Sequence, residues 1–166
     1  MPLWFALIAQ AALLSYALVG GVFLAFSDFI MRALSQLDGA SGAGAMQNIN
    51  REVFRWVFMT LFLGLAPVSL LLAGYGALWL GGTAGVLIAL GGLVYLLGCF
   101  AVTVAANVPM NEALAAMDRS APATQAYWSG TYLPRWTFWN SLRTLACALA
   151  AALLLAGLLR AGHPPA

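Results

Sequence analysis

The sequence contains no lysine, a single histidine and two cysteines, and charged residues make up only 7% of its 166 residues. Soluble domains carry roughly 25% charged residues, so a surface this poor in charge cannot face water on all sides. The seven arginines form no basic stripe, which excludes nucleic acid as an expected partner. With 63% hydrophobic residues and a mean hydropathy of +0.92, the composition favours a membrane protein whose main partner is the lipid bilayer.

Potential metal ligands are equally scarce. The only histidine, His163, stands in the tail of the chain, so one chain cannot hold a haem between two histidines. Cys99 and Cys147 both lie within apolar runs, and neither their spacing nor their setting indicates a disulfide or a metal site. We therefore predict no metal and no cofactor, and we interpret the two cysteines as small core residues.

Four apolar runs are long enough to cross a bilayer, because a transmembrane helix needs about 20 apolar residues. They cover residues 3–34, 52–80, 83–117 and 125–160. Gly81-Gly82 predicts a short turn between the second and third runs, and residues 34–50, rich in Gly, Ala and Ser, predict a loop between the first two. The fold class that follows is all-α: a single domain over residues 1–166, built as an up-down bundle of four transmembrane helices.

Polar residues gather at one end of this predicted bundle. All five acids, all five asparagines and six of the seven arginines belong to the end that carries the two longer connections. The opposite end holds both termini and the Gly81-Gly82 turn. Arginine-rich loops stay on the cytoplasmic side of a membrane, so we expect both termini to lie outside. We expect the location to be a bacterial inner (plasma) membrane, and the oligomeric state stays open.

Helical spacing places several polar groups on shared faces, because residues three or four positions apart lie on one side of a helix. The residues concerned are Thr103, Asn107 and Asn111 in the third run, and Trp136, Asn140 and Arg143 in the fourth. If these faces look inward, they enclose a pocket with amide, guanidinium and indole donors. The aromatic residues that could form its wall are Phe23, Phe26, Trp56 and Trp139.

Arg143 is the charged residue expected deepest in the membrane. It stands 17 residues before Arg160 in the sequence, on the order of 25 Å along a helix. An arginine facing lipid at that depth costs about 2.5 to 3.5 kcal/mol. We therefore expect its side chain to point into the bundle and to bind a carboxylate or several amide oxygens. The competing interpretation of the polar layer is that its asparagines and arginines cap helix ends and anchor the bundle at the headgroups.

Four segments carry a resemblance to a known family: FSDFIMRAL (26–34), AMQNINR (45–51), TVAANVPMNEALAAMD (103–118) and YLPRWTFWNSLRT (132–144). They resemble the anthrone oxygenase-like family, small four-helix membrane proteins of mostly unknown function. A few fungal members are associated with the oxidation of anthrones to anthraquinones without a cofactor. The family pattern emphasises Asn50, Arg51, Asn107, Pro109, Asn111, Arg135, Trp136, Trp139, Asn140 and Arg143. We expect all of these except Pro109 and Arg135 to bind the substrate. Ser141 stands where the family commonly has a histidine, so a mechanism with an imidazole base is in doubt.

The resemblance implies oxidation of a polycyclic aromatic or phenolic substrate by O₂. Such a reaction needs a base, for which Asp28 and Glu112 are the candidates, and donors that hold the resulting oxyanion. The two carboxylates could equally be structural partners of an arginine. The alternative function is non-enzymatic: a membrane protein that binds a lipid or a quinone-like small molecule, or that supports a partner protein.

Overall fold

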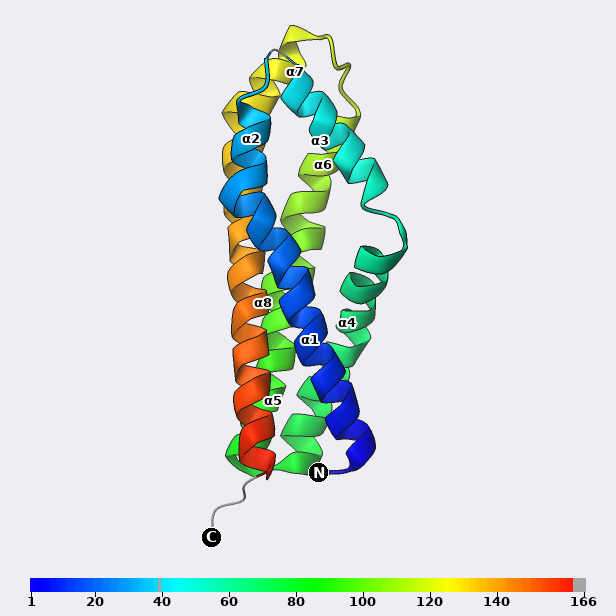
Figure 1. The fold of residues 1–166 in the computed structure, drawn as a ribbon, viewed down its shortest axis with the longest axis vertical. Helices are drawn as coiled ribbons and strands as arrows, with labels where there is room; N and C mark the ends of the chain where they lie inside the picture. The colour runs from blue at the N-terminus through cyan, green and yellow to red at the C-terminus, as the bar shows by residue number, and fades with distance from the viewer. Residues whose placement is uncertain (39, 163–166) are drawn as a thin grey trace.

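The structure is a bundle of four long helical segments. The computed structural model describes residues 1–38 and 40–162, and within them the chain forms helices and turns without a strand. The segments long and apolar enough to cross a membrane are Leu3–Ser35, Trp56–Leu80, Gly82–Ala115 and Pro122–Gly162. Successive segments run in opposite directions, so that the N-terminus, the turn at Gly81 and the end of the last helix lie together (Figure 1). The predicted all-α, up-down bundle is confirmed.

Each span contains at least one π-helical turn, whose hydrogen bonds join residues five positions apart. The first span consists of α1 (Leu3–Ala25), η1 (Phe26–Ile30) and α2 (Met31–Ser35), and the second of α4 (Trp56–Tyr75) and η2 (Gly76–Leu80). The third consists of α5 (Gly82–Tyr95), η3 (Leu96–Ala101), η4 (Thr103–Asn107) and α6 (Val108–Ala115). The fourth consists of α7 (Pro122–Tyr127), η5 (Trp128–Tyr132) and α8 (Leu133–Gly162).

The spans pack in a ring in the order of the sequence. α4 lies between α1 and α5, and α8 closes the ring by packing against α5 and α1. Gly81 and Gly82 form the predicted turn with φ angles of +65° and +58°, a backbone region that favours glycine. The predicted boundaries are close, except that the second span begins at Trp56 rather than at residue 52.

Residues 41–52 correct the predicted loop, because they form the helix α3 (Ser41–Glu52). Glycine weakens an isolated helix, but here small residues let α3 pack closely on its neighbours. A Cβ at Gly42 would collide with the carbonyl oxygen of Leu34. Gln47 is buried and donates to the carbonyl oxygens of Leu114, at 2.7 Å, and Met117, at 3.0 Å. Tertiary packing therefore overrides the local composition.

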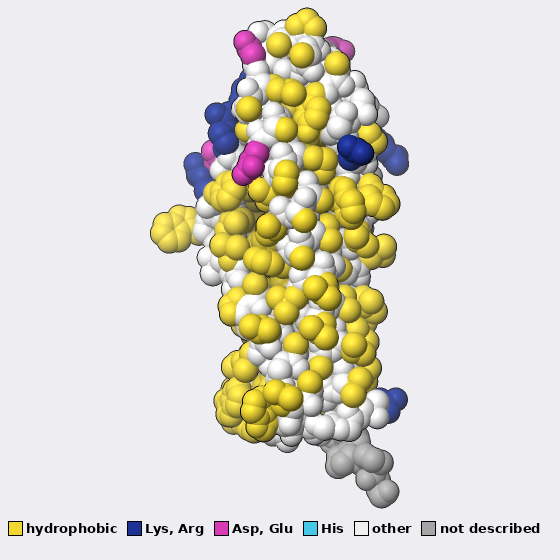
Figure 2. All heavy atoms as spheres, turned by 180° about the vertical axis from the view of Figure 1, so that it is seen from behind, with side chains coloured by type: hydrophobic (Ala, Val, Ile, Leu, Met, Phe, Trp, Pro, Cys, Tyr) yellow, Lys and Arg dark blue, Asp and Glu magenta, His cyan; other side chains and the backbone are white. Residues whose placement is uncertain are grey.

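The two ends of the bundle differ in composition. We call residues 23–62 and 100–143 the charged end, and residues 3–20, 63–98 and 146–162 the turn end. Acidic and basic side chains cluster in the upper part of the molecule in Figure 2, and hydrophobic side chains cover most of the surface below them. This apolar surface has the character of one that faces lipid, and the chain is an integral membrane protein. At the charged end, the backbone N–H and hydroxyl of Ser120 donate to Asp118 and lower the pKa of its carboxyl.

Close helix contacts hold the turn end together. A Cβ at Gly92 would collide with the backbone of Ser69, and a Cβ at Gly157 would come within 2.6 Å of Ile88. Buried polar groups are paired here as well, since the hydroxyls of Tyr16 and Ser69 lie 2.6 Å apart. Small residues thus bring α4, α5 and α8 together, as is usual where lipid supplies no hydrophobic drive for association.

Candidate functional site

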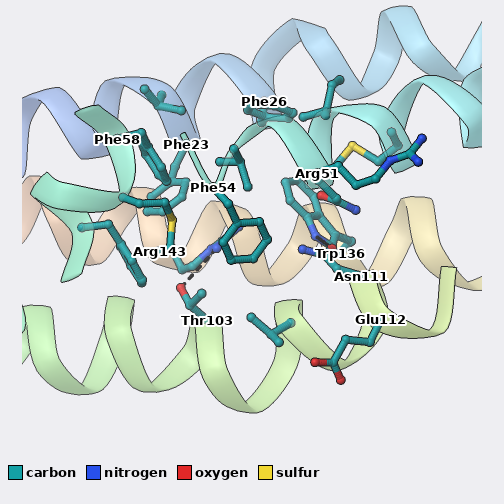
Figure 3. A pocket seen from close by; sticks show the side chains of 18 of the residues that line it. Phe23, Phe26, Arg51, Phe54, Phe58, Thr103, Asn111, Glu112, Trp136 and Arg143 are labelled. Atoms are coloured by element: carbon teal, nitrogen blue, oxygen red, sulfur yellow. Dashed lines mark hydrogen bonds between the residues drawn. The ribbon is translucent and has the colours of Figure 1, made fainter. Parts of the chain in front are cut away.

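A cavity of about 500 Å³ lies at the charged end, between α3 and α4 on one side and the other three spans on the other. Its wall is largely hydrophobic and includes the aromatic side chains of Phe23, Phe26, Phe54, Phe58, Phe62, Phe100 and Trp136. Its polar lining residues are Gln47, Asn50, Arg51, Thr103, Asn111, Glu112 and Arg143. Figure 3 shows Arg143 with Thr103 towards one end of the cavity, and Arg51, Asn111 and Glu112 towards the other.

Arg143 is the buried cation of this cavity, with 4% of its surface exposed. Its guanidinium donates to the hydroxyl of Thr103 at 3.1 Å and to Oδ1 of Asn140 at 2.7 Å. Its Cζ lies 4.1 Å from the ring centroid of Phe23 and 5.3 Å from that of Trp136. The predicted inward orientation is confirmed. Among the described residues its partners include no carboxylate, and its Nε has no hydrogen-bond partner.

A second polar group surrounds Asn111. Its Oδ1 accepts two hydrogen bonds, from the hydroxyl of Tyr132 at 2.7 Å and from the indole Nε1 of Trp136 at 2.8 Å. The hydroxyl of Tyr132 in turn accepts from Nδ2 of Asn50 at 3.2 Å. The structure therefore brings together Asn50, Asn111 and Trp136, three of the residues expected in the site, through a tyrosine that the sequence argument did not include.

Asn107 and Asn140, two other expected site residues, bind the backbone instead of lining the cavity. Nδ2 of Asn107 donates to the carbonyl oxygen of Trp136 at 3.2 Å, and Nδ2 of Asn140 donates to that of Phe23 at 2.6 Å. The bond to Trp136 holds the Asn107 amide against α8, so Asn107 does not line the cavity with Thr103 although the two stand four positions apart. Asn140 reaches the cavity only through its bond to Arg143.

The charged residues expected in the site also fall into two groups, those that line the cavity and those that do not. Glu112 and Arg51 both line the cavity and are exposed, and Nη2 of Arg51 donates to Oδ1 of Asn48 at 2.5 Å. Asp28 is exposed and does not line the cavity. Neither carboxylate forms an ion pair in the described part of the chain, where Arg55 pairs with Glu52. Of the two proposed bases, only Glu112 is a lining residue of the cavity.

The aromatic wall differs from the expected one. Phe23 and Phe26 line the cavity, but Trp56 is 87% exposed, and neither it nor Trp139 contributes to the lining. The sequence argument missed Phe54, Phe58, Phe62, Phe100 and Tyr132. A signal for three of them was present, because Phe54, Phe58 and Phe62 follow one another at intervals of four residues, the spacing of one helix face.

The two cysteines meet at the centre of the bundle. The Sγ atoms of Cys147 and Cys99 lie 3.5 Å apart, and both side chains are free thiols with no exposed surface. Their interpretation as core residues is confirmed. No group of three His, Cys, Asp or Glu side chains comes together within residues 1–38 and 40–162. His163 lies outside the described residues.

The fold and the cavity define a class: a four-helix integral membrane protein with a cavity at one end of the bundle, lined by aromatic side chains and by a buried arginine that has no carboxylate partner among the described residues. The family model of anthrone oxygenase matches residues 56–153, which is more than half of the chain. The protein therefore belongs to the anthrone oxygenase family. Searches of curated proteins and of solved structures found no match. The matched region starts at Trp56 and so excludes α1 and α3, which supply Phe23, Asn50 and Arg51 to the cavity.

Proposed function

We propose that the cavity binds a polycyclic aromatic or phenolic substrate and that the protein oxidises it with O₂ without a cofactor. The observation that carries this proposal is Arg143, a buried cation that lines an aromatic cavity and has no carboxylate partner among the described residues. A buried charge is costly unless it is compensated. An anionic oxygen of a bound ligand supplies the compensation.

In this proposal Arg143 stabilises the charge that develops during the reaction. For an anthrone-like substrate, loss of a proton from the methylene carbon places negative charge on the oxygen at the opposite edge of the ring system. A fixed guanidinium in a water-poor site stabilises that oxyanion without having to reorganise. The rings of Phe23 and Trp136 hold the guanidinium in place through cation–π contacts.

Glu112 is the proposed base. Its carboxylate takes one proton from the methylene carbon, and that carbon then forms a bond to O₂ to give a peroxide. When the second proton leaves the same carbon, the O–O bond breaks, the carbon keeps one oxygen as a carbonyl, and the other oxygen leaves as water. One O₂ is thus reduced by four electrons while the methylene group is oxidised by four. Asp28 is not assigned this role, because it lies outside the cavity lining.

The test is O₂ uptake with an anthrone substrate by the protein in lipid nanodiscs, after subtraction of autoxidation in empty nanodiscs. Loss of a general base lowers turnover by about 100-fold, the effect expected for Glu112→Gln. Loss of an oxyanion donor lowers turnover by a similar factor, so Arg143→Leu should also lower turnover by about 100-fold. Arg143→Lys keeps the charge but loses the planar fork, so it should fall between wild type and Arg143→Leu.

Arg135→Lys is the matched control, because Arg135 is an exposed arginine on α8 that does not line the cavity. Its turnover should equal that of wild type. An O₂ uptake no faster than in empty nanodiscs would contradict the enzymatic proposal. Binding of the anthrone without turnover would instead support the alternative, a non-enzymatic protein that binds a quinone-like molecule.

We further propose that the charged end faces the cytoplasm and both termini face outside. Five arginines flank the two connections at the charged end: Arg32, Arg51, Arg55, Arg119 and Arg135. The turn end carries Arg160, so the arginine bias favours a cytoplasmic charged end. A Ser41→Cys variant tests this, because Ser41 is exposed while Cys99 and Cys147 are fully buried. Labelling with a membrane-impermeant thiol reagent should require access from the cytoplasmic side, and labelling from outside alone would reverse the topology.

A further inference from the structure

The side-chain amide of Asn111 has a defined orientation. Two groups donate hydrogen bonds to its oxygen: the indole Nε1 of Trp136, at 2.8 Å, and the hydroxyl of Tyr132, at 2.7 Å. An indole N–H can only donate, so the atom of Asn111 that faces Trp136 must be the oxygen. This chemical argument settles which atom of the amide is the oxygen and which is the nitrogen.

The consequence is a free N–H donor at the cavity. Both lone pairs of Oδ1 are engaged by Trp136 and Tyr132. Nδ2 of Asn111 has no hydrogen-bond partner among the described residues, and Asn111 lines the cavity. Figure 3 shows Asn111 beside Trp136, on the part of the wall away from Arg143. The cavity therefore offers N–H donors at two separate places, the guanidinium and this amide.

Tyr132 contributes to this arrangement without touching the cavity. Its side chain has no exposed surface, and its ring stacks on Trp128, with centroids 5.4 Å apart, and on Trp136, at 6.1 Å. Its hydroxyl accepts from Nδ2 of Asn50, which leaves its own proton for Asn111. The stacked rings hold the hydroxyl in place, so any influence of Tyr132 on a ligand passes through Asn111.

We propose that Tyr132 and Trp136 are positioning residues that fix the Asn111 amide with its N–H group towards the cavity. The cavity then selects planar aromatic ligands that carry hydrogen-bond acceptor oxygens at two edges, one for Arg143 and one for Asn111. A ligand oxygen that accepts satisfies both donors, whereas a plain hydrocarbon leaves them unpaired. This inference rests on the proposed function, because it takes the ligand of the cavity to be a planar aromatic molecule.

The experiment compares two probes of the same three-ring outline, anthraquinone and anthracene, in equilibrium dialysis against nanodiscs, with empty nanodiscs subtracted. The readout is the ratio of their dissociation constants, because loss of folding or of the aromatic wall changes both affinities alike. Asn111→Asp keeps an oxygen for Trp136 and Tyr132 but replaces the N–H donor by a second oxygen. It should lower the preference for the quinone by about tenfold while anthracene binding stays at the wild-type level.

Tyr132→Phe removes one of the two groups that orient the amide and leaves the stacked rings in place. A hydrogen bond of this kind is worth about 1 kcal/mol, so the quinone preference should fall by about fivefold or less. The matched control is Gln36→Glu, which adds the same charge to an exposed side-chain amide of the charged end outside the cavity lining. Its quinone preference should be unchanged.

The outcomes separate this inference from the proposed function. A wild-type protein that binds neither probe would overturn the aromatic cavity and the donor assignment with it. Binding of both probes, with the same quinone preference in wild type, Asn111→Asp and Tyr132→Phe, would overturn the donor assignment alone. Failure of the enzymatic proposal alone would give a different result, namely no turnover with an anthrone substrate while the ratios of the dissociation constants stay as predicted here.

Discussion

The same four spans run through both ends of the bundle, but most of the closest glycine contacts lie at the turn end and the cavity lies at the charged end. At the turn end, glycines such as Gly85 and Gly92 bring backbones so close that a single added carbon would collide with a neighbouring helix. At the charged end, bulky rings such as those of Phe58 and Trp136 border a cavity of about 500 Å³. Figure 1 shows α4 close to its neighbours near the turn and α3 at the opposite end of the bundle.

The two ends therefore separate the residues expected to stabilise the fold from those expected to bind a ligand. In lipid, helices associate through close packing rather than through the hydrophobic effect, so the stability should be concentrated where the helices touch. The cavity lacks such contacts. Its lining includes Arg143, which is the one buried arginine among the described residues, with 4% of its surface exposed. We therefore expect substitutions at the turn end to change folding, and those at the charged end to change ligand binding.

The largest effect is expected for Gly92→Val at the turn end. Its Cβ would collide with the carbonyl oxygen of Ser69 and would lie 3.0 Å from the amide nitrogen of Ala73, so α4 and α5 must separate. Overpacking of this kind costs about 3 kcal/mol, measurable as the free energy of unfolding by steric trapping in bicelles. Gly64→Val is the control, because a Cβ at Gly64 meets nothing within 4 Å. Equal stability of the two variants would contradict the division into two ends.

A smaller effect is expected from a matched pair of phenylalanines. Phe5, at the turn end, has no exposed surface and stacks on Tyr75 with centroids 4.2 Å apart. Phe58 is half-buried and borders the cavity. Because the unfolded helices are also surrounded by lipid, Phe5→Ala should lose mainly packing contacts and cost about 2 kcal/mol. Phe58→Ala should cost less than about 1 kcal/mol, because its ring already faces empty space. The same unfolding assay checks both, and a larger loss for Phe58→Ala would reverse the comparison.

The smallest effect on stability is expected for Arg143→Leu, although Arg143 is a buried charge. Replacement of a poorly compensated buried charge by an apolar side chain of similar size is often neutral or stabilising. Loss of the bonds to Thr103 and Asn140 opposes that gain. We expect a net change within about 1 kcal/mol, together with loss of ligand binding. Unfolding by several kcal/mol would show that Arg143 serves the fold, and the pocket proposal would lose its main support.

Several features of this protein were determined by the sequence alone. Lipid requires long apolar runs, so the four spans and the Gly81-Gly82 turn followed from composition and from one local conformation. The inward orientation of Arg143 followed in the same way, because the cost of a charge in the membrane depends on its depth and not on which neighbours receive it. The gathering of polar residues at one end is likewise a matter of position along the helices.

The site itself was decided by the tertiary structure. Whether residues 41–52 are loop or helix depended on packing against Leu34 and against Leu114, the latter far away in the sequence. A hydrogen bond to the backbone of Trp136, on another span, holds Asn107 away from the cavity lining, and periodicity cannot anticipate such a bond. Tyr132 became part of the site because its hydroxyl meets Asn111 from another span. Hydrogen bonds between distant segments exist only once the helices are packed, so tertiary packing decided which polar groups bind the backbone and which face the cavity.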